Sequence, residues 1–233
     1  ITEQSIRPQK IQLRADVNTL QDLQQLLGEI NWIRPTLGIS NEELAPLFGL
    51  LKGDCNINSS KTITPEAQKT LEKVTTALQQ RQAHSCAPEK PFFLAVLREK
   101  TQLYGLIFQW DTSQKDSLLI IEWIFLPYMR HYRSPKTILT TLEMTTTIII
   151  KGRTRLLAMA GQDFAVIHLP LKREYFDWAL QNSEDLQVAL LSYSDVCSTY
   201  FPSHKLLQAK FSFTEKPLLN EVPLDAVTLF TDG

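Results

Sequence analysis

The residues of this chain whose types and spacing suit binding lie between Leu20 and Pro35. Gln24, Gly28 and Trp32 follow one another at intervals of four, so on a helix they share one face. A glycine inside a helix costs about 1 kcal/mol relative to alanine, and this cost is accepted where another backbone must approach closely. The glutamine amide and the indole would then contact whatever approaches. The spacing alone leaves two interpretations open, a binding surface or the close packing of a neighbouring helix on Gly28.

A second group of residues suited to binding is basic. Between residues 130 and 155 the sequence has six basic residues and one acidic residue, Glu143. The basic residues are Arg130, Arg133, Lys136, Lys151, Arg153 and Arg155. Lys151 and Arg155 share a helical face, whereas Arg153 points elsewhere. This stretch fits contacts to phosphate groups, and it fits a solvated helix face equally well.

Residues suited to catalysis are sparse. The sequence has no glycine-rich phosphate loop, HExxH, GxSxG or paired-cysteine motif. Two-metal phosphoryl chemistry needs several carboxylates that converge on ions ~4 Å apart, and only Asp232, in the string FTDG, is placed for such a role. One carboxylate cannot hold two metal ions. His168, between Ile167 and Leu169 of an expected strand, is interpreted as a structural histidine.

The elements that must position these residues begin with three helices. Asn18 or Thr19 can cap the first helix, which Pro35 is expected to end. In the second helix, Ser40 and Glu43 form a capping box.

Two residues set the expected limits of that second helix. Pro46 implies that its regular part begins nearby, and Gly53 is a natural stop. Thr64 and Pro65 open the third helix over residues 65–82. The apolar stripe of the third helix is formed by Ala67, Leu71, Val74 and Leu78.

The pattern changes after residues 84–91, which have the composition of a linker. Three short runs rich in β-branched and aromatic residues, 92–97, 103–110 and 118–126, predict a three-stranded meander. The elements expected after them are a helix over 135–160, a strand over 165–170, helices over 172–183 and 185–195, and a strand over 227–232. The fold class is therefore α+β, with three helices followed by a mixed α/β layer.

Composition is that of an ordinary soluble globular chain. The 233 residues are 43% hydrophobic and 21% charged, with a net charge of -1, so nucleic-acid binding would have to come from local patches. Cys55, Cys86 and Cys197 are far apart, which predicts neither disulfides nor a thiolate metal site and fits a reducing compartment. The longest apolar stretch contains Glu122 and is too short to cross a bilayer, and the N-terminus lacks a signal-peptide pattern. We therefore expect no membrane partner.

Several strings resemble retroviral reverse transcriptases. LQDLQQLLGEINWIRPTLGI, LAPLFGLLKGD and ITPEA are similar to the thumb subdomain, especially that of betaretroviral and endogenous K-type elements. IEWIFLP, KGRTRLLAMAGQDF and VIHLPLKREYFDWALQNSEDLQVALLSY resemble the connection subdomain. VTLFTDG resembles the opening strand of the ribonuclease H domain. The likeness covers nearly the whole chain in the right order.

The resemblance implies four segments. Residues 1–83 correspond to the thumb with a short lead-in and 84–91 to a linker, about which we expect the two main parts to move. Residues 92–223 correspond to a ribonuclease-H-like connection domain, and 224–233 to the start of a truncated ribonuclease H domain.

The resemblance also implies a role in nucleic-acid binding. In the family the thumb helix lays a glutamine, a glycine and a tryptophan into the minor groove of the primer-template duplex, and the match puts these roles on Gln24, Gly28 and Trp32. Further contacts are expected from Asn31, Lys52, Lys151, Arg153 and Arg155. The implied partner is an RNA/DNA hybrid or duplex, bound independently of sequence. Remaining Pol segments or a second subunit are further expected partners, and a non-catalytic protein-interaction module is the alternative function.

Catalysis is not expected from this chain alone. The family's palm carries paired aspartates, and no adjacent Asp pair occurs here. Of the four acidic residues of the ribonuclease H site only the first, Asp232, is matched, so Asp232 is an orphan carboxylate that would bind a metal only in a full-length protein. No cofactor is expected for this chain. The full-length parent enzyme is expected to use Mg. We expect a Pol fragment that is cytoplasmic, or in the virion core of an intact virus.

Overall fold

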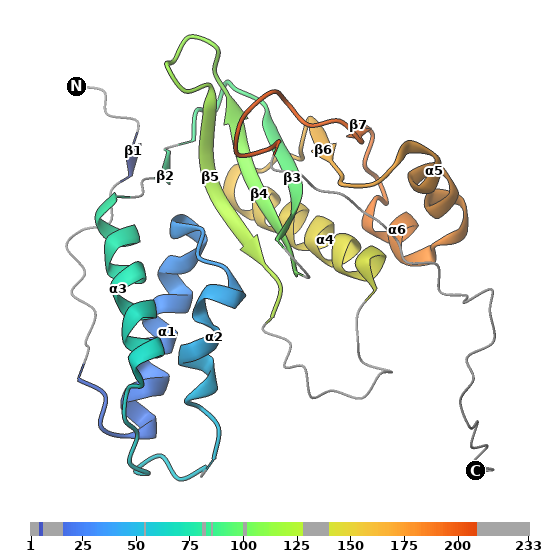
Figure 1. Cartoon of the computed structure of the whole chain (residues 1–233). Coiled ribbons are helices and arrows are strands. Elements are labelled where there is room, and N and C mark those ends of the chain that lie inside the picture. Colours follow the sequence, from blue (N-terminus) through green and yellow to red (C-terminus); the bar gives the residue numbers. More distant parts are fainter. Residues whose placement is uncertain are drawn as a thin grey trace, which may run out of the picture.

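The computed structural model describes residues 5–6, 16–53, 55–80, 83–84, 86–99, 102–127 and 140–208. Within this part of the chain a group of helices precedes a five-stranded sheet that carries further helices (Figure 1). The expected α+β class is confirmed. The expected strand over 227–232, Asp232, and the basic residues Arg130, Arg133 and Lys136 lie outside the described residues.

Three amphipathic helices build the N-terminal part. They are α1 (Leu20–Leu37), α2 (Asn41–Gly49) and α3 (Pro65–Gln80). Thr19 caps α1 and forms a capping box with Asp22, and Ser40 does the same with Glu43 for α2. The helices enclose one apolar cluster that includes Leu23, Leu27, Ile30, Leu44, Leu47, Ala67, Leu71 and Val74. Burial of this shared face holds the three helices together.

Both prolines lie inside their helices, contrary to expectation. Helix α1 continues past Pro35 and ends at Gly38, whose left-handed backbone (φ 64°) places its N–H 3.0 Å from the Arg34 carbonyl oxygen. A proline removes one hydrogen bond from a helix, and this loss falls in the last turn of α1. The capping box rather than Pro46 sets the start of α2.

The end of α2 also differs from the prediction. The helix ends at Gly49 rather than Gly53, and Leu50, Leu51 and Lys52 follow in tight turns with hydrogen bonds to the third residue before each.

The sheet is an antiparallel meander extended by two parallel strands. The meander, which confirms the prediction, consists of β3 (Phe92–Glu99), β4 (Gln102–Trp110) and β5 (Leu118–Phe125). β6 (Val166–His168) pairs parallel with β3, and β7 (Val196–Ser198) pairs parallel with β6. The resulting order, β5-β4-β3-β6-β7, is that of a ribonuclease-H-like fold.

Helix α4 (Thr141–Ala160) packs closely on one face of this sheet. A Cβ added at Gly105 of β4 would lie 2.8 Å from Ile148, and one at Gly152 would lie 3.1 Å from Leu94, so both glycines permit the approach. The threonines at the start of α4 are accommodated in the helix, where their hydroxyls donate to carbonyl oxygens of the preceding turn, as Thr145 does to Thr141 at 2.8 Å.

Two shorter helices follow, α5 (Arg173–Asn182) and α6 (Glu184–Ala189). Phe176 and Ala179 of α5 are buried against the sheet side of the domain core. The helix predicted over 185–195 is shorter in the structure, and the three-residue strand β7 directly after that range was not predicted.

His168 lies in an aromatic cluster on the other face of the sheet. Its ring stacks against Phe93 and Phe108 and lies near Phe201. The Nδ1 atom is 2.7 Å from the carbonyl oxygen of Tyr200, which it bonds as a donor. Burial lowers the pKa of His168. The neutral, hydrogen-bonded ring supports the structural interpretation.

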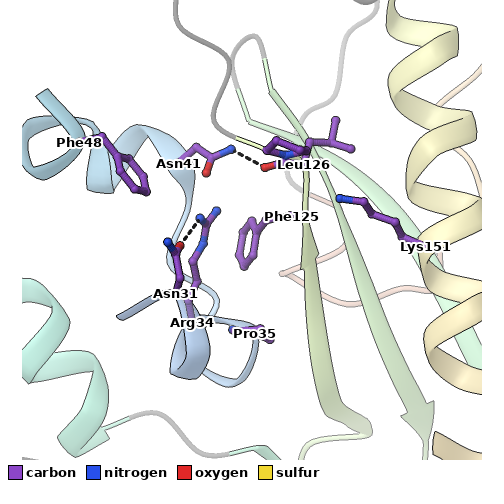
Figure 2. Close-up of a pocket in the computed structure, with 9 residues that line it drawn as sticks. Asn31, Arg34, Pro35, Asn41, Phe48, Phe125, Leu126 and Lys151 are labelled. Carbon is purple, nitrogen blue, oxygen red and sulfur yellow. Dashed lines mark hydrogen bonds between the residues drawn. The ribbon is translucent and has the colours of Figure 1, made fainter. Parts of the chain in front are cut away.

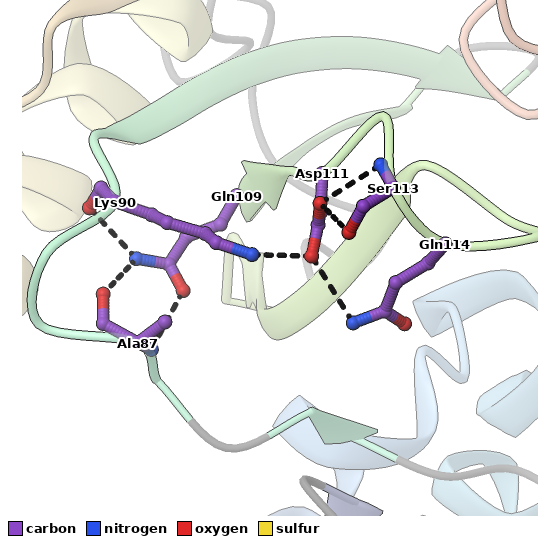
Figure 3. Close-up of polar contacts among 6 residues, drawn as sticks. All are labelled: Ala87, Lys90, Gln109, Asp111, Ser113 and Gln114. Carbon is purple, nitrogen blue, oxygen red and sulfur yellow. Dashed lines mark hydrogen bonds and ion pairs between the residues drawn. The ribbon is translucent and has the colours of Figure 1, made fainter.

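The segment expected to be a linker is fixed to the sheet. The side chain of Gln109, fully buried on β4, donates from Nε2 to the carbonyl oxygens of Ala87 (2.8 Å) and Lys90 (2.9 Å). Its Oε1 accepts from the Ala87 N–H at 2.9 Å (Figure 3). Lys90 also pairs with Asp111, whose pKa this contact lowers. At the start of this segment, β2 (Ala83–His84) pairs with β1 (Ser5–Ile6).

Replacing Gln109 with leucine is expected to loosen this segment. The Ala87 N–H and two carbonyl groups would lose their partner, and each buried unsatisfied group costs roughly 1–3 kcal/mol. We expect a lower free energy of unfolding in urea titration and faster amide exchange at Ala87. Gln114→Leu, at an exposed site, is the control, and equal stabilities for the two variants would contradict the prediction.

The helical part lies against β5, the edge of the sheet (Figure 1). The Arg34 guanidinium lies 4.0 Å from the ring centre of Phe125. Asn41 Nδ2 donates to the Leu126 carbonyl oxygen at 2.9 Å. Gly38 faces the indole of Trp123. These contacts dock the helical part on the sheet edge, and the motion expected about residues 84–91 stays a prediction.

Candidate nucleic-acid interface

The polar face of α1 is open to solvent along its length. Gln24, Gly28, Asn31 and Trp32 are all exposed, and Trp32 is 81% exposed. A Cβ added at Gly28 would meet no atom within 4 Å. No helix of the described residues therefore packs on Gly28, and the packing interpretation of this glycine is wrong for this part of the chain. We call Gln24, Gly28, Asn31 and Trp32 the α1 stripe.

Lys52 lies on a different element. It is exposed in the turn after α2, where its carbonyl oxygen accepts a hydrogen bond of 2.7 Å from Lys61 Nζ. Its predicted contact with nucleic acid stays a prediction.

Arg153 of α4 has a structural role. Its Nε donates to Asp163 at 2.9 Å, and its Nη1 donates to the carbonyl oxygens of Ala189 (2.7 Å) and Leu191 (3.0 Å). The guanidinium also lies 5.4 Å from the ring centre of Tyr193. Arg153 therefore joins α4 to the end of α6, which leaves little of its hydrogen-bonding capacity for a phosphate.

The other two predicted cations of α4 differ in their pairing. Arg155 Nε donates to both carboxylate oxygens of Glu122 on β5, at 3.0 and 2.8 Å. Lys151 is exposed and has no hydrogen-bond or ion-pair partner among the described residues. Of the three cations predicted on α4, Lys151 is the one whose charge is uncompensated.

A pocket of about 340 Å³ lies at the junction of the helices and the sheet. Figure 2 shows that α1 and α2 form one wall, and that β5 and Lys151 of α4 form the other. Among the residues that line it are Asn31, Arg34, Asn41, Phe125, Leu126 and Lys151. The pocket thus brings together Asn31 of the α1 stripe and Lys151, two predicted site residues that are far apart in the sequence.

Arg34 is a residue of this pocket that sequence reasoning missed. It is 6% exposed, and its Nε donates to the Ile39 carbonyl oxygen at 2.8 Å. Burial lowers its pKa to about 10, so it stays charged at neutral pH, and the charge of Glu43 opposes this shift. Its Nη2 has no partner, and it forms no ion pair within the described residues. Arg34 falls on the same face of α1 as Leu27 and Ile30. A charged residue within this apolar stripe is unusual, and this feature of the sequence could have identified Arg34 as a candidate site residue.

Other kinds of site are not formed by the described ranges. No three His, Cys, Asp or Glu side chains gather there in a way that could hold a metal ion. None of the helices in those ranges has the length and apolar character needed to cross a bilayer.

Two family models match successive parts of the chain. Residues 8–72 match the reverse transcriptase thumb domain, and residues 100–207 match the ERVK-8-like, RNaseH-like domain. Among similar curated proteins, the Gag-Pro-Pol polyprotein of mouse mammary tumor virus (strain BR6) is 34% identical over 98% of this chain. The Gag-Pro-Pol polyproteins of Simian retrovirus SRV-1 and Mason-Pfizer monkey virus are each 33% identical over 98% of the chain.

These matches define a chain in which a reverse transcriptase thumb precedes an RNase H-like domain. The alignments cover 13% of the mouse mammary tumor virus polyprotein and 12% of the other two, so the chain corresponds to a small part of these relatives. It belongs to the retroviral Pol proteins. The resemblance expected from the sequence is confirmed.

Proposed function

We propose that this chain binds RNA/DNA hybrid or duplex nucleic acid, independently of sequence, through the α1 stripe. The observation that carries the proposal is the open space at Gly28 between exposed Gln24 and Trp32. A polynucleotide backbone can approach a helix closely where a side chain is missing. The glutamine amide can donate to minor-groove acceptors, which every base pair presents.

The proposal includes no catalytic step. Polymerisation and RNA hydrolysis would belong to the longer Pol protein, with Mg held by carboxylates of which this chain supplies Asp232. The expected location is the cytoplasm, or the virion core of an intact virus.

A salt titration with a matched pair of tryptophan variants tests the binding surface. We expect the affinity of the chain for a fluorescent RNA/DNA hybrid to fall linearly on a log-log plot against salt, because bound phosphates release counterions. Trp32→Ala is expected to weaken binding several-fold. Trp178→Ala, which removes a 55% exposed tryptophan from α5, should leave binding unchanged. Equal affinities for the two variants would reject the α1 stripe as the contact.

A protein-interaction module is the second candidate, supported by apolar side chains exposed near β7. Val188, Leu191, Val196 and Tyr200 are 57%, 69%, 58% and 80% exposed. The partner would be another Pol segment or a second subunit. Sedimentation of the purified chain separates the candidates, since self-association without salt-dependent hybrid binding would favour the module.

A further inference from the structure

The pocket at the junction continues the α1 stripe. Asn31 and Pro35, which line the pocket, lie on the same helical face as Gln24 and Gly28. At 1.5 Å per residue, Gln24 and Pro35 are about 16 Å apart along α1. This length corresponds to about five base pairs at ~3.4 Å each. A nucleic-acid strand that lies along the α1 stripe therefore reaches the pocket.

Among the described residues, the lining of the pocket has two cations and no acidic residue. Arg34 and Lys151 are its two cations, and Asn31 and Asn41 contribute amides. Arg34 is buried and forms no ion pair among the described residues, although the charge of Glu43 acts on it from outside the lining, and its Nη2 has no hydrogen-bond partner. Asn41 Oδ1 also lacks a partner, but it carries no charge that could neutralise Arg34 (Figure 2). Burying an unpaired charge is unfavourable, so this pocket favours an oxyanion.

We propose that the pocket binds one phosphate group of the backbone of a nucleic acid that lies along α1. Lys151 Nζ and the Asn31 amide reach the phosphate oxygens from opposite walls, and Arg34 supplies a buried positive charge behind them. This inference rests on the proposed function and names the backbone phosphate as the group that the junction recognises. Since the pocket is shared by the thumb and the sheet, the contact also depends on their docking.

The first arm of the test measures the hybrid. Lys151→Gln is expected to weaken binding of the RNA/DNA hybrid by several-fold at low salt and to reduce the slope of log affinity against log salt by about 1, the value of one lost phosphate contact. Lys172→Gln, at the exposed residue before α5, is the matched control and should change neither quantity.

The second arm uses inorganic phosphate without nucleic acid. We expect phosphate to shift the side-chain amide NMR signals of Asn31 and Asn41 in the unmodified chain, and these shifts should saturate as phosphate is added. In Lys151→Gln the shifts should be lost. Sodium acetate at equal ionic strength reports on carboxylate binding.

The two arms together separate the outcomes. Saturable phosphate shifts with a reduced salt slope support the proposal. Phosphate shifts with an unchanged slope would show a site for free phosphate and overturn the backbone assignment, as would saturation by acetate alone. Absence of both effects rejects the pocket. If the unmodified chain does not bind hybrid at all, the proposed function fails, and phosphate shifts would then show an oxyanion site that serves another ligand.

Discussion

A Gly28→Val chain is expected to keep its stability while its affinity for RNA/DNA hybrid falls by about tenfold or more. An added Cβ at Gly28 meets no atom within 4 Å, so the free protein has room for a side chain at this position. Valine has a higher helix propensity than glycine, which makes the variant at least as stable as the parent. Valine would, however, occupy the space into which a nucleic-acid backbone enters, and a tenfold loss of affinity corresponds to about 1.4 kcal/mol.

The controls for this prediction come from the same part of the chain. Gly49→Val changes another glycine with no neighbour within 4 Å, at the end of α2, and should leave binding unaltered. Gly28→Ala should have an intermediate affinity. Fluorescence anisotropy with a labelled hybrid and thermal unfolding give both quantities. A Gly28→Val chain that binds as well as the parent would remove the basis of the proposed function.

Gly38→Ala is expected to destabilise the junction between the thumb and the sheet by about 2–5 kcal/mol. Gly38 has a φ of +64°, a conformation that costs other residues roughly 1–2 kcal/mol. The new Cβ would also lie 2.7 Å from the indole of Trp123, and such overpacking typically costs ~1–3 kcal/mol. Relief of the clash requires α1 or Trp123 to move, so the Arg34–Phe125 contact should weaken too.

Gly161→Ala isolates the backbone part of this effect. Gly161 ends α4 with a φ of +66°, but an added Cβ there has no neighbour within 4 Å. Urea unfolding should therefore show a smaller loss for Gly161→Ala, of about 1–2 kcal/mol. If both variants lost the same free energy of unfolding, the indole of Trp123 would not restrict the side chain at position 38.

Local signals in the sequence predicted most elements of the fold. The Ser40–Glu43 capping box marked the start of α2, and short runs rich in β-branched and aromatic residues marked the three strands of the meander. Element ends were less predictable, because Pro35 costs α1 little in its last turn. Strand β7 was missed since three residues carry too little pattern, and its pairing with β6 is set by tertiary structure.

The candidate site was predictable only in part. Spacing placed Gln24, Gly28 and Trp32 on one face, and the structure shows that face exposed. The pocket could not be predicted, because it joins Arg34 to Lys151 through packing of α1 against the sheet edge. The sequence also did not show that Arg153 pairs with Asp163, because this contact depends on the path of the chain between α4 and β6.

The position of the thumb also bears on aggregation. A strand at the margin of a sheet is a template on which a strand of another molecule can add, and long apolar margins are the most hazardous. Here the long margin is β5, and α1 and β2 both contact it, whereas the opposite margin, β7, has only three residues. The thumb therefore covers the edge of the sheet that is most open to such addition. An RNase H-like domain produced without it would expose the eight residues of β5 and be prone to form intermolecular β-structure.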